Sequence, residues 1–119
     1  MAAPLVNPHG HLIGSRTRDE VERVLARADA EAGSGRRRRF LQGVSAACAW
    51  ALGRTPAGPV TGAPAGPDGP GVGAMTAEVD AAVVQLEVAG AALPGGARDF
   101  VQGAHDALAW LCGYSDDRP

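Results

Sequence analysis

The sequence predicts an all-α fold in which two tandem helical hairpins, produced by an internal duplication, pack into a four-helix bundle. Three observations lead to this prediction. Residues 40–53 match residues 100–113 at an offset of sixty positions. Apolar residues recur at helical spacing in and before each copy. A Pro- and Gly-rich segment separates the two copies. The length of 119 residues allows one domain.

Residues 1–16 are expected to form a flexible N-terminus. They lack a basic region followed by an apolar stretch, so we expect no signal peptide. No apolar run in the chain approaches the roughly 18 residues needed to span a membrane. These patterns predict a cytoplasmic protein without a membrane partner. His9 and His11 have no cysteine or carboxylate cluster beside them, so we expect no metal site there.

Residues 17–53 form the first predicted hairpin. Thr17 and Glu20 have the spacing of a capping box, which marks the start of a helix. Apolar residues then follow at helical spacing, namely Val21, Val24, Leu25 and Ala28. The glycines of Gly33-Ser34-Gly35 end this helix and open the next one. Such a short connection predicts antiparallel neighbours.

Residues 76–113 form the second predicted hairpin. Thr76 is expected to cap a helix whose apolar face contains Val79, Val83, Leu86 and Gly90. Leu93-Pro94-Gly95-Gly96 then breaks that helix. Between the hairpins, residues 54–75 are rich in proline and glycine and are expected to form an extended or disordered linker. Residues 114–119 are expected to be a loose tail.

The second helix of each hairpin carries the clearest pattern. The two copies read FLQGVSAACAWALG and FVQGAHDALAWLCG, and they align the chain's two phenylalanines and its two tryptophans. Each copy has a large, small, small, large stripe within about 120° of arc. We predict that the packing interface consists of Phe40, Gly43, Trp50, Phe100, Gly103 and Trp110. Gly43 and Gly103 lie between the aromatic residues, where they would let another helix approach closely.

A polar strip lies on the opposite side of these helices. It contains Arg38 and Gln42 in the first copy and Arg98 and Gln102 in the second, with Ser45 and His105 beside them. We prefer the interpretation of a solvated helix face, since polar helix faces usually have that role. The alternative is a contact strip for a partner or for helix pairing.

The sharpest charged feature is the run Arg36-Arg37-Arg38-Arg39, at the predicted start of a helix. The helix dipole disfavours cations there by about 0.3–1 kcal/mol each. Either nearby carboxylates such as Asp29 and Glu31 or an external anion would compensate. The run is therefore a candidate anion-binding site. A net charge of −2 excludes a globally basic protein and places nucleic acid second among the expected partners.

Catalytic patterns are absent from the sequence. It has no phosphate loop and no lysine to supply one. His105 and Asp106 are neighbours in sequence, so on a helix their side chains diverge. Cys48 and Cys112 are interpreted as free thiols that act as small hydrophobes. We therefore predict a protein that is not an enzyme and that carries no cofactor.

The apolar residues are dominated by alanine, with two Phe, two Trp and one Tyr in the chain. Alanine buries little area, so the core is expected to be thin and to need a self-interface or another protein. All eleven basic residues are arginine, and the composition resembles that of small accessory proteins of GC-rich bacteria and their phages. We expect a non-enzymatic interaction or assembly protein that forms a homo-oligomer or binds a protein partner. The alternative is an accessory nucleic-acid-binding protein that uses Arg36 to Arg39.

Overall fold

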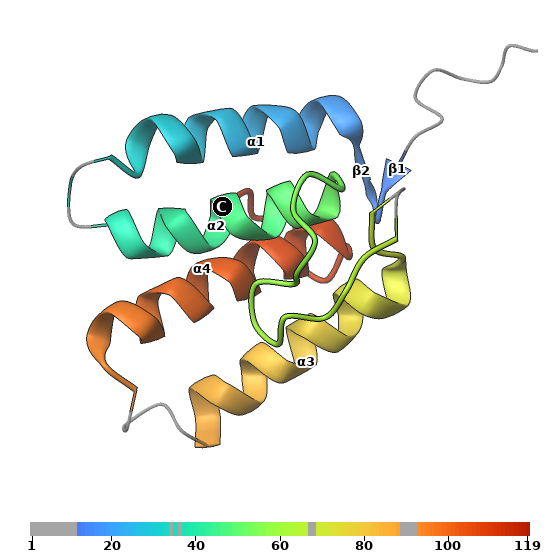
Figure 1. Ribbon diagram of the computed structural model, residues 1–119. Helices are drawn as coiled ribbons and strands as arrows, with labels where there is room; N and C mark the ends of the chain where they lie inside the picture. Colours follow the sequence, from blue (N-terminus) through green and yellow to red (C-terminus); the bar gives the residue numbers. More distant parts are fainter. Residues whose placement is uncertain (1–11, 34, 36, 67–68, 89–92) are drawn as a thin grey trace, which may run out of the picture.

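The computed structural model describes residues 12–33, 35, 37–66, 69–88 and 93–119. His9, His11, Arg36 and Gly90, which the sequence analysis discussed, lie outside these ranges. The elements are β1 (Leu12–Ile13), β2 (Arg16–Thr17), α1 (Arg18–Glu31), α2 (Arg38–Ala51), α3 (Val72–Val88) and α4 (Gly95–Leu111) (Figure 1).

The four helices are stacked in the order α1, α2, α4, α3 (Figure 1). Helices α2 and α4 form the centre and make the most extensive contact in the molecule, while α1 packs on α2 and α3 packs on α4. The prediction of a mostly helical fold with four packed helices is confirmed. Within the described residues, no helix has the length and apolar character needed to cross a membrane.

The two glycines of the predicted stripe lie where α2 and α4 cross. A Cβ atom on Gly43 would overlap the carbonyl oxygen of Phe100, and one on Gly103 would overlap that of Phe40. The contact is thus reciprocal, because in each helix the glycine faces the phenylalanine carbonyl oxygen of the other helix. Glycine is required at both positions because the two backbones are in direct contact.

Helix α1 begins as its sequence predicts. Thr17 is the N-cap, its hydroxyl accepts from the amide of Glu20, and the Glu20 carboxylate accepts from the amide of Thr17 at 2.9 Å. This reciprocal capping box satisfies two amides that the helix leaves unpaired. The bond from the Thr17 amide lowers the pKa of Glu20.

Helices α2 and α4 end with the same motif. Gly53 and Gly113 have φ of 79° and 83°, the left-handed conformation that glycine adopts without strain. After α2, the amides of Gly53 and Arg54 donate to the carbonyls of Trp50 and Ala49. After α4, Gly113 and Tyr114 repeat these two bonds. These are Schellman motifs, which satisfy carbonyls at the helix ends.

The start of the described chain folds against the end of α4. Strands β1 and β2 pair antiparallel, with Leu12 opposite Thr17. The Ser15 amide donates to the Leu111 carbonyl at 2.7 Å, and the Arg16 Nε donates to the Trp110 carbonyl at 2.8 Å. The Arg16 guanidinium also lies 4.9 Å from the centre of the Trp110 ring. Residues 12–16, expected to be flexible, thereby cover the α4 C-terminus.

The core differs from the predicted stripe by a small rotation of the helices. Trp50 and Trp110 are buried as expected, but Phe40 and Phe100 are only half-buried. The buried face of α2 instead adds Leu41 and Cys48, and that of α4 adds Val101 and Leu108. The aromatic rings of Phe40 and Phe100 lie at the edge of the interface because the glycine crossing fixes the helix rotation.

Helix α3 differs more from its prediction. It begins at Val72 rather than at Thr76, so the last residues of the predicted linker form its first turn. Thr76 is inside the helix, with its hydroxyl near Cys112 and Tyr114, and does not cap it. The buried residues are Met75, Glu78, Val79 and Ala82. Val83 and Leu86, expected on the buried face, are half-buried.

The outer helices follow one burial pattern. Val21, Val24, Leu25 and Ala28 of α1 correspond in order to Met75, Glu78, Val79 and Ala82 of α3, each 54 residues later. In the central helices the offset is sixty. Both α3 and α4 have 17 residues, whereas α1 and α2 have 14. The starts of α1 and α3 correspond, as do the ends of α2 and α4, so the extra residues lie beside the turn between α3 and α4.

Candidate functional site

The outer face of α3 is an apolar surface that no described element covers. Val72 and Val84 each have 56% of their area exposed, and Val88 has 81%. Helix α3 has no basic residue, and its exposed charges are Asp80 and Glu87. Apolar residues occur all around this helix, and only one side of it packs on α4. We call the exposed residues Ala77, Asp80, Val84, Glu87 and Val88 the α3 outer face.

On its inner side, α3 carries a buried carboxylate that holds the connecting segment. Glu78 is 1% exposed and accepts from the amides of Val60 and Thr61, at 2.9 and 3.2 Å, and from the Thr61 hydroxyl. Gly58 leaves the space that this carboxylate occupies. Residues 54–66 therefore pack against the helices with a defined conformation, including a bridge between Ala57 and Pro64. Glu78, which stands at the position of Val24 in α1, was not predicted from the sequence to be a buried or functional residue.

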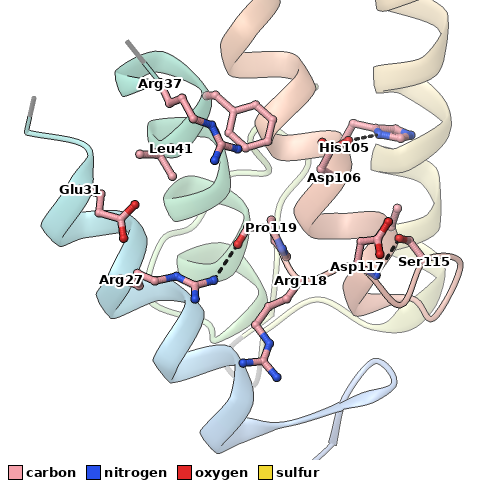
Figure 2. Close-up of a pocket in the computed structure, with 12 residues that line it drawn as sticks. Arg27, Glu31, Arg37, Leu41, His105, Asp106, Ser115, Asp117, Arg118 and Pro119 are labelled. Carbon is pink, nitrogen blue, oxygen red and sulfur yellow. Dashed lines mark hydrogen bonds and ion pairs between the residues drawn. The ribbon is translucent and has the colours of Figure 1, made fainter. Parts of the chain in front are cut away.

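A pocket of about 590 Å³ lies between α1, α2, α4 and the C-terminal tail (Figure 2). We call it the tail pocket. Its apolar lining comes from Phe40, Leu41, Ala109 and Pro119. The remaining lining is polar or charged and consists of Arg27, Glu31, Arg37, His105, Asp106, Ser115, Asp117 and Arg118.

Two of the arginines of the tail pocket are held in place. Arg27 donates from Nη2 to the carbonyl oxygen of Pro119 at 2.8 Å (Figure 2). The guanidinium of Arg37 lies 4.5 Å from the centre of the Phe40 ring. Such cation–π stacking restricts the Arg37 side chain while leaving its N–H donors available.

The opposite wall of the tail pocket is a polar pair on α4. His105 Nδ1 lies 3.0 Å from Asp106 Oδ1, and this oxygen also accepts from Gln102 Nε2 at 2.8 Å. The prediction that the His105 and Asp106 side chains diverge is therefore wrong. Figure 2 draws this contact between the two neighbouring side chains.

The structure separates the arginine run into different environments. Arg37 lines the tail pocket, whereas Arg39 lines a second pocket of about 480 Å³ beside Pro94, Ala97, Phe100 and Val101. Arg39 also donates to Gln42 at 3.2 Å. Arg38 is exposed. The described arginines of the run thus do not share one surface.

The predicted polar strip makes different contacts in its two copies. Gln42 accepts from Arg39, whereas Gln102 donates to Asp106. Ser45 donates to Asp29 of α1, and this contact links the outer helix to the central one. Arg38 and Arg98 are both exposed. The strip therefore contributes to the tail pocket through Gln102 and to helix packing through Ser45.

The two thiols occupy different sites. Burial raises the pKa of Cys48 to about 12, with a further contribution from the charge of Asp29. Cys112 is half-buried; its burial also raises its pKa, while its contact with the Thr76 hydroxyl opposes the rise. Across the described residues, no three His, Cys, Asp or Glu side chains are grouped as metal ligands would be.

The sequence did not predict the residues that complete the tail pocket, namely Arg27, Ser115, Asp117, Arg118 and Pro119, and Glu31 was expected only as a possible counter-charge for the arginine run. Arg27 and Glu31 carried a weak signal, since they lie one turn apart on the polar side of a predicted helix. The tail carried none, because its position depends on the folded helices. Comparison of the chain with family models, curated proteins and solved structures gave no match.

Proposed function

We propose that the protein is a non-enzymatic helical interaction protein that binds another protein through the α3 outer face. The observation that carries this proposal is the exposure of Val84 and Val88 on a helix that packs on one side only. Exposed apolar surface of this kind marks interaction sites in soluble proteins. The hairpin similarity also leads us to infer an internal duplication, in which α3 corresponds to α1.

The charges of this face indicate the chemistry of the partner. Asp80 and Glu87 flank the exposed valines, and α3 contains no arginine. A complementary partner is an amphipathic helix with apolar residues at positions i, i+3, i+4 and i+7 and basic residues at its sides. Two copies of the chain pairing through α3 would instead bring carboxylates near one another. We therefore propose a basic helix of another protein as the occupant.

The proposal is tested by titrating the protein with an amphipathic leucine/lysine peptide and with the same peptide carrying glutamate for lysine. Fluorescence anisotropy gives both dissociation constants. We expect the lysine peptide to bind and the glutamate peptide to bind at least about tenfold more weakly, a difference of about 1.4 kcal/mol. The variant Val84→Asp/Val88→Asp should lose binding of the lysine peptide.

The matched control for the single variant Val84→Asp is Ala30→Asp, because Ala30 of α1 stands at the position that corresponds to Val84 and is also exposed. This control should bind like the unmodified protein. Equal binding of the two peptides, or equal loss in the control, would contradict the proposal. So would a homodimer in light scattering that Val84→Asp/Val88→Asp converts to a monomer, since the second copy would then be the occupant.

A further inference from the structure

We propose that the tail pocket binds a small organic anion, namely a molecule with one carboxylate, sulfonate or phosphate-ester group and an apolar body. This is a ligand site separate from the α3 outer face, and it does not depend on the function proposed above. The volume of about 590 Å³ lies within the roughly 300–1,000 Å³ typical of small-molecule sites.

The pocket residues of α1, α2 and α4, and Arg37 before α2, have counterparts in the other half of the repeat. The apolar lining is retained there, since Phe40, Leu41 and Ala109 correspond to Phe100, Val101 and Ala49. The charged lining is not retained. Arg27, Glu31, Arg37, His105 and Asp106 correspond to Ala81, Gln85, Ala97, Ser45 and Ala46.

The apolar and the charged lining residues of the pocket therefore have different roles. The corresponding positions are neutral at all five places, three in the second hairpin and two in the first, and α3 still packs on α4 as α1 packs on α2. The fold therefore does not need charges there. The apolar residues keep their type because they pack the helices in both halves. The charged residues occur on only one side of the repeat, and helix packing does not require them. Their presence indicates that the pocket has a ligand of its own.

Three guanidinium groups supply positive charge to the tail pocket. Arg27, Arg37 and Arg118 reach the pocket from three separate segments, α1, the turn before α2 and the tail (Figure 2). Within the described residues, none of these guanidinium groups lies within 4.0 Å of an Asp or Glu carboxylate oxygen, and Arg27 donates one hydrogen bond to the backbone oxygen of Pro119. Guanidinium groups bind carboxylate and phosphate oxygens in a bidentate geometry.

The acidic residues of the lining limit the charge of the ligand. The Asp106 carboxylate contacts both His105 and Gln102 through one oxygen, Oδ1. Glu31 and Asp117 remain and would repel a polyanion such as a nucleic-acid backbone. One anionic group is therefore favoured, with its apolar body against Phe40, Leu41 and Pro119.

The test uses two fluorescent probes that share a ring system. 1-Anilinonaphthalene-8-sulfonate carries one anionic group, whereas N-phenyl-1-naphthylamine lacks it. We expect Arg27→Gln/Arg37→Gln to weaken binding of the sulfonate at least about tenfold, because both guanidinium contacts are lost. Binding of the neutral probe should change less than about twofold in this variant, since the apolar lining is intact.

Two control variants test whether the loss of sulfonate binding is specific to the tail pocket. Arg23→Gln/Arg38→Gln removes the same charge from exposed positions on α1 and α2 outside the pocket and should leave sulfonate binding unchanged. Val84→Asp/Val88→Asp disrupts the α3 outer face and should also leave it unchanged. Circular dichroism checks that each variant is folded. The proposal is overturned if Arg27→Gln/Arg37→Gln binds the sulfonate normally, if either control weakens it equally, or if the neutral probe loses affinity in parallel.

Discussion

The carbonyl oxygen of Phe40 lies directly against Gly103, and this contact sets the distance between the two central helices. The same relationship holds in reverse between Phe100 and Gly43. The central pair consequently crosses at closer range than side chains with a Cβ would allow. Everything else in the fold is placed relative to this crossing, because α1 and α3 each pack on one of the two helices.

Substitution Gly103→Ala is expected to destabilise the protein by about 1–3 kcal/mol, because the new methyl group overlaps backbone atoms of α2 that cannot move independently. Chemical denaturation followed by circular dichroism measures the change. The control is Gly73→Ala, at an exposed helical position with open space around it. There alanine should stabilise the helix by up to about 1 kcal/mol. Similar changes in stability at both positions would contradict the direct backbone contact between α2 and α4 at Gly103.

Much of the central pair could be predicted from the sequence. Gly43 and Gly103 recur between large residues, and Thr17 with Glu20 forms a local motif, so both signals lie within a few residues. The rotation of the helices could not be predicted to within one residue. Phe40 and Leu41 are adjacent, and only the crossing decides that Leu41 is the more buried.

Neither the orientation of α3 nor the tail pocket could be predicted from the sequence, and the reason is different. Helix α3 has apolar residues on every side, so its periodicity selects no face. From the sequence alone, Glu78 would be expected to face solvent. Its partners, Val60 and Thr61, lie 18 and 17 residues earlier in a Pro- and Gly-rich segment. The tail pocket assembles groups from four segments, which no local pattern connects.

Removal of a buried tryptophan should be among the most damaging single changes. Trp50 is fully buried, and Trp110 is covered by Arg16. We expect Trp50→Ala and Trp110→Ala each to lower the free energy of unfolding by about 3–5 kcal/mol, through lost burial and the resulting cavity. Urea denaturation provides the measurement. A loss below about 1 kcal/mol would show that the ring is not part of the core.

The carboxylate of Glu78 should anchor residues 57–66 to α3. In Glu78→Val, the residue found at the corresponding position of α1, the amides of Val60 and Thr61 lose their acceptor. We expect these amides to exchange with deuterium faster and the stability to fall by about 1–3 kcal/mol. The exchange of α1 amides serves as the internal control and should change less. Unaltered protection at Val60 and Thr61 would contradict this anchoring role.

The two cysteines should differ in reactivity. Since burial raises the pKa of Cys48 to about 12, its thiol stays protonated and inaccessible at neutral pH. Iodoacetamide is expected to label Cys112 first in the folded protein and both residues in urea, as peptide mass spectrometry would show. The raised pKa means that the folded state favours the protonated Cys48 thiol. The contribution of this thiol to the free energy of unfolding should therefore fall as pH rises from about 9 toward 12. Faster labelling of Cys48 than of Cys112 would be incompatible with the described core.

An amide chemical-shift map tests whether the α3 outer face binds a basic partner helix. The ¹⁵N-labelled protein is titrated with the leucine/lysine peptide, and the shift of each amide is followed. We expect the largest shifts at Ala77, Asp80, Val84, Glu87 and Val88, with small shifts on α1. Shifts centred on α1 or on the turn before α2, with α3 unaffected, would contradict it.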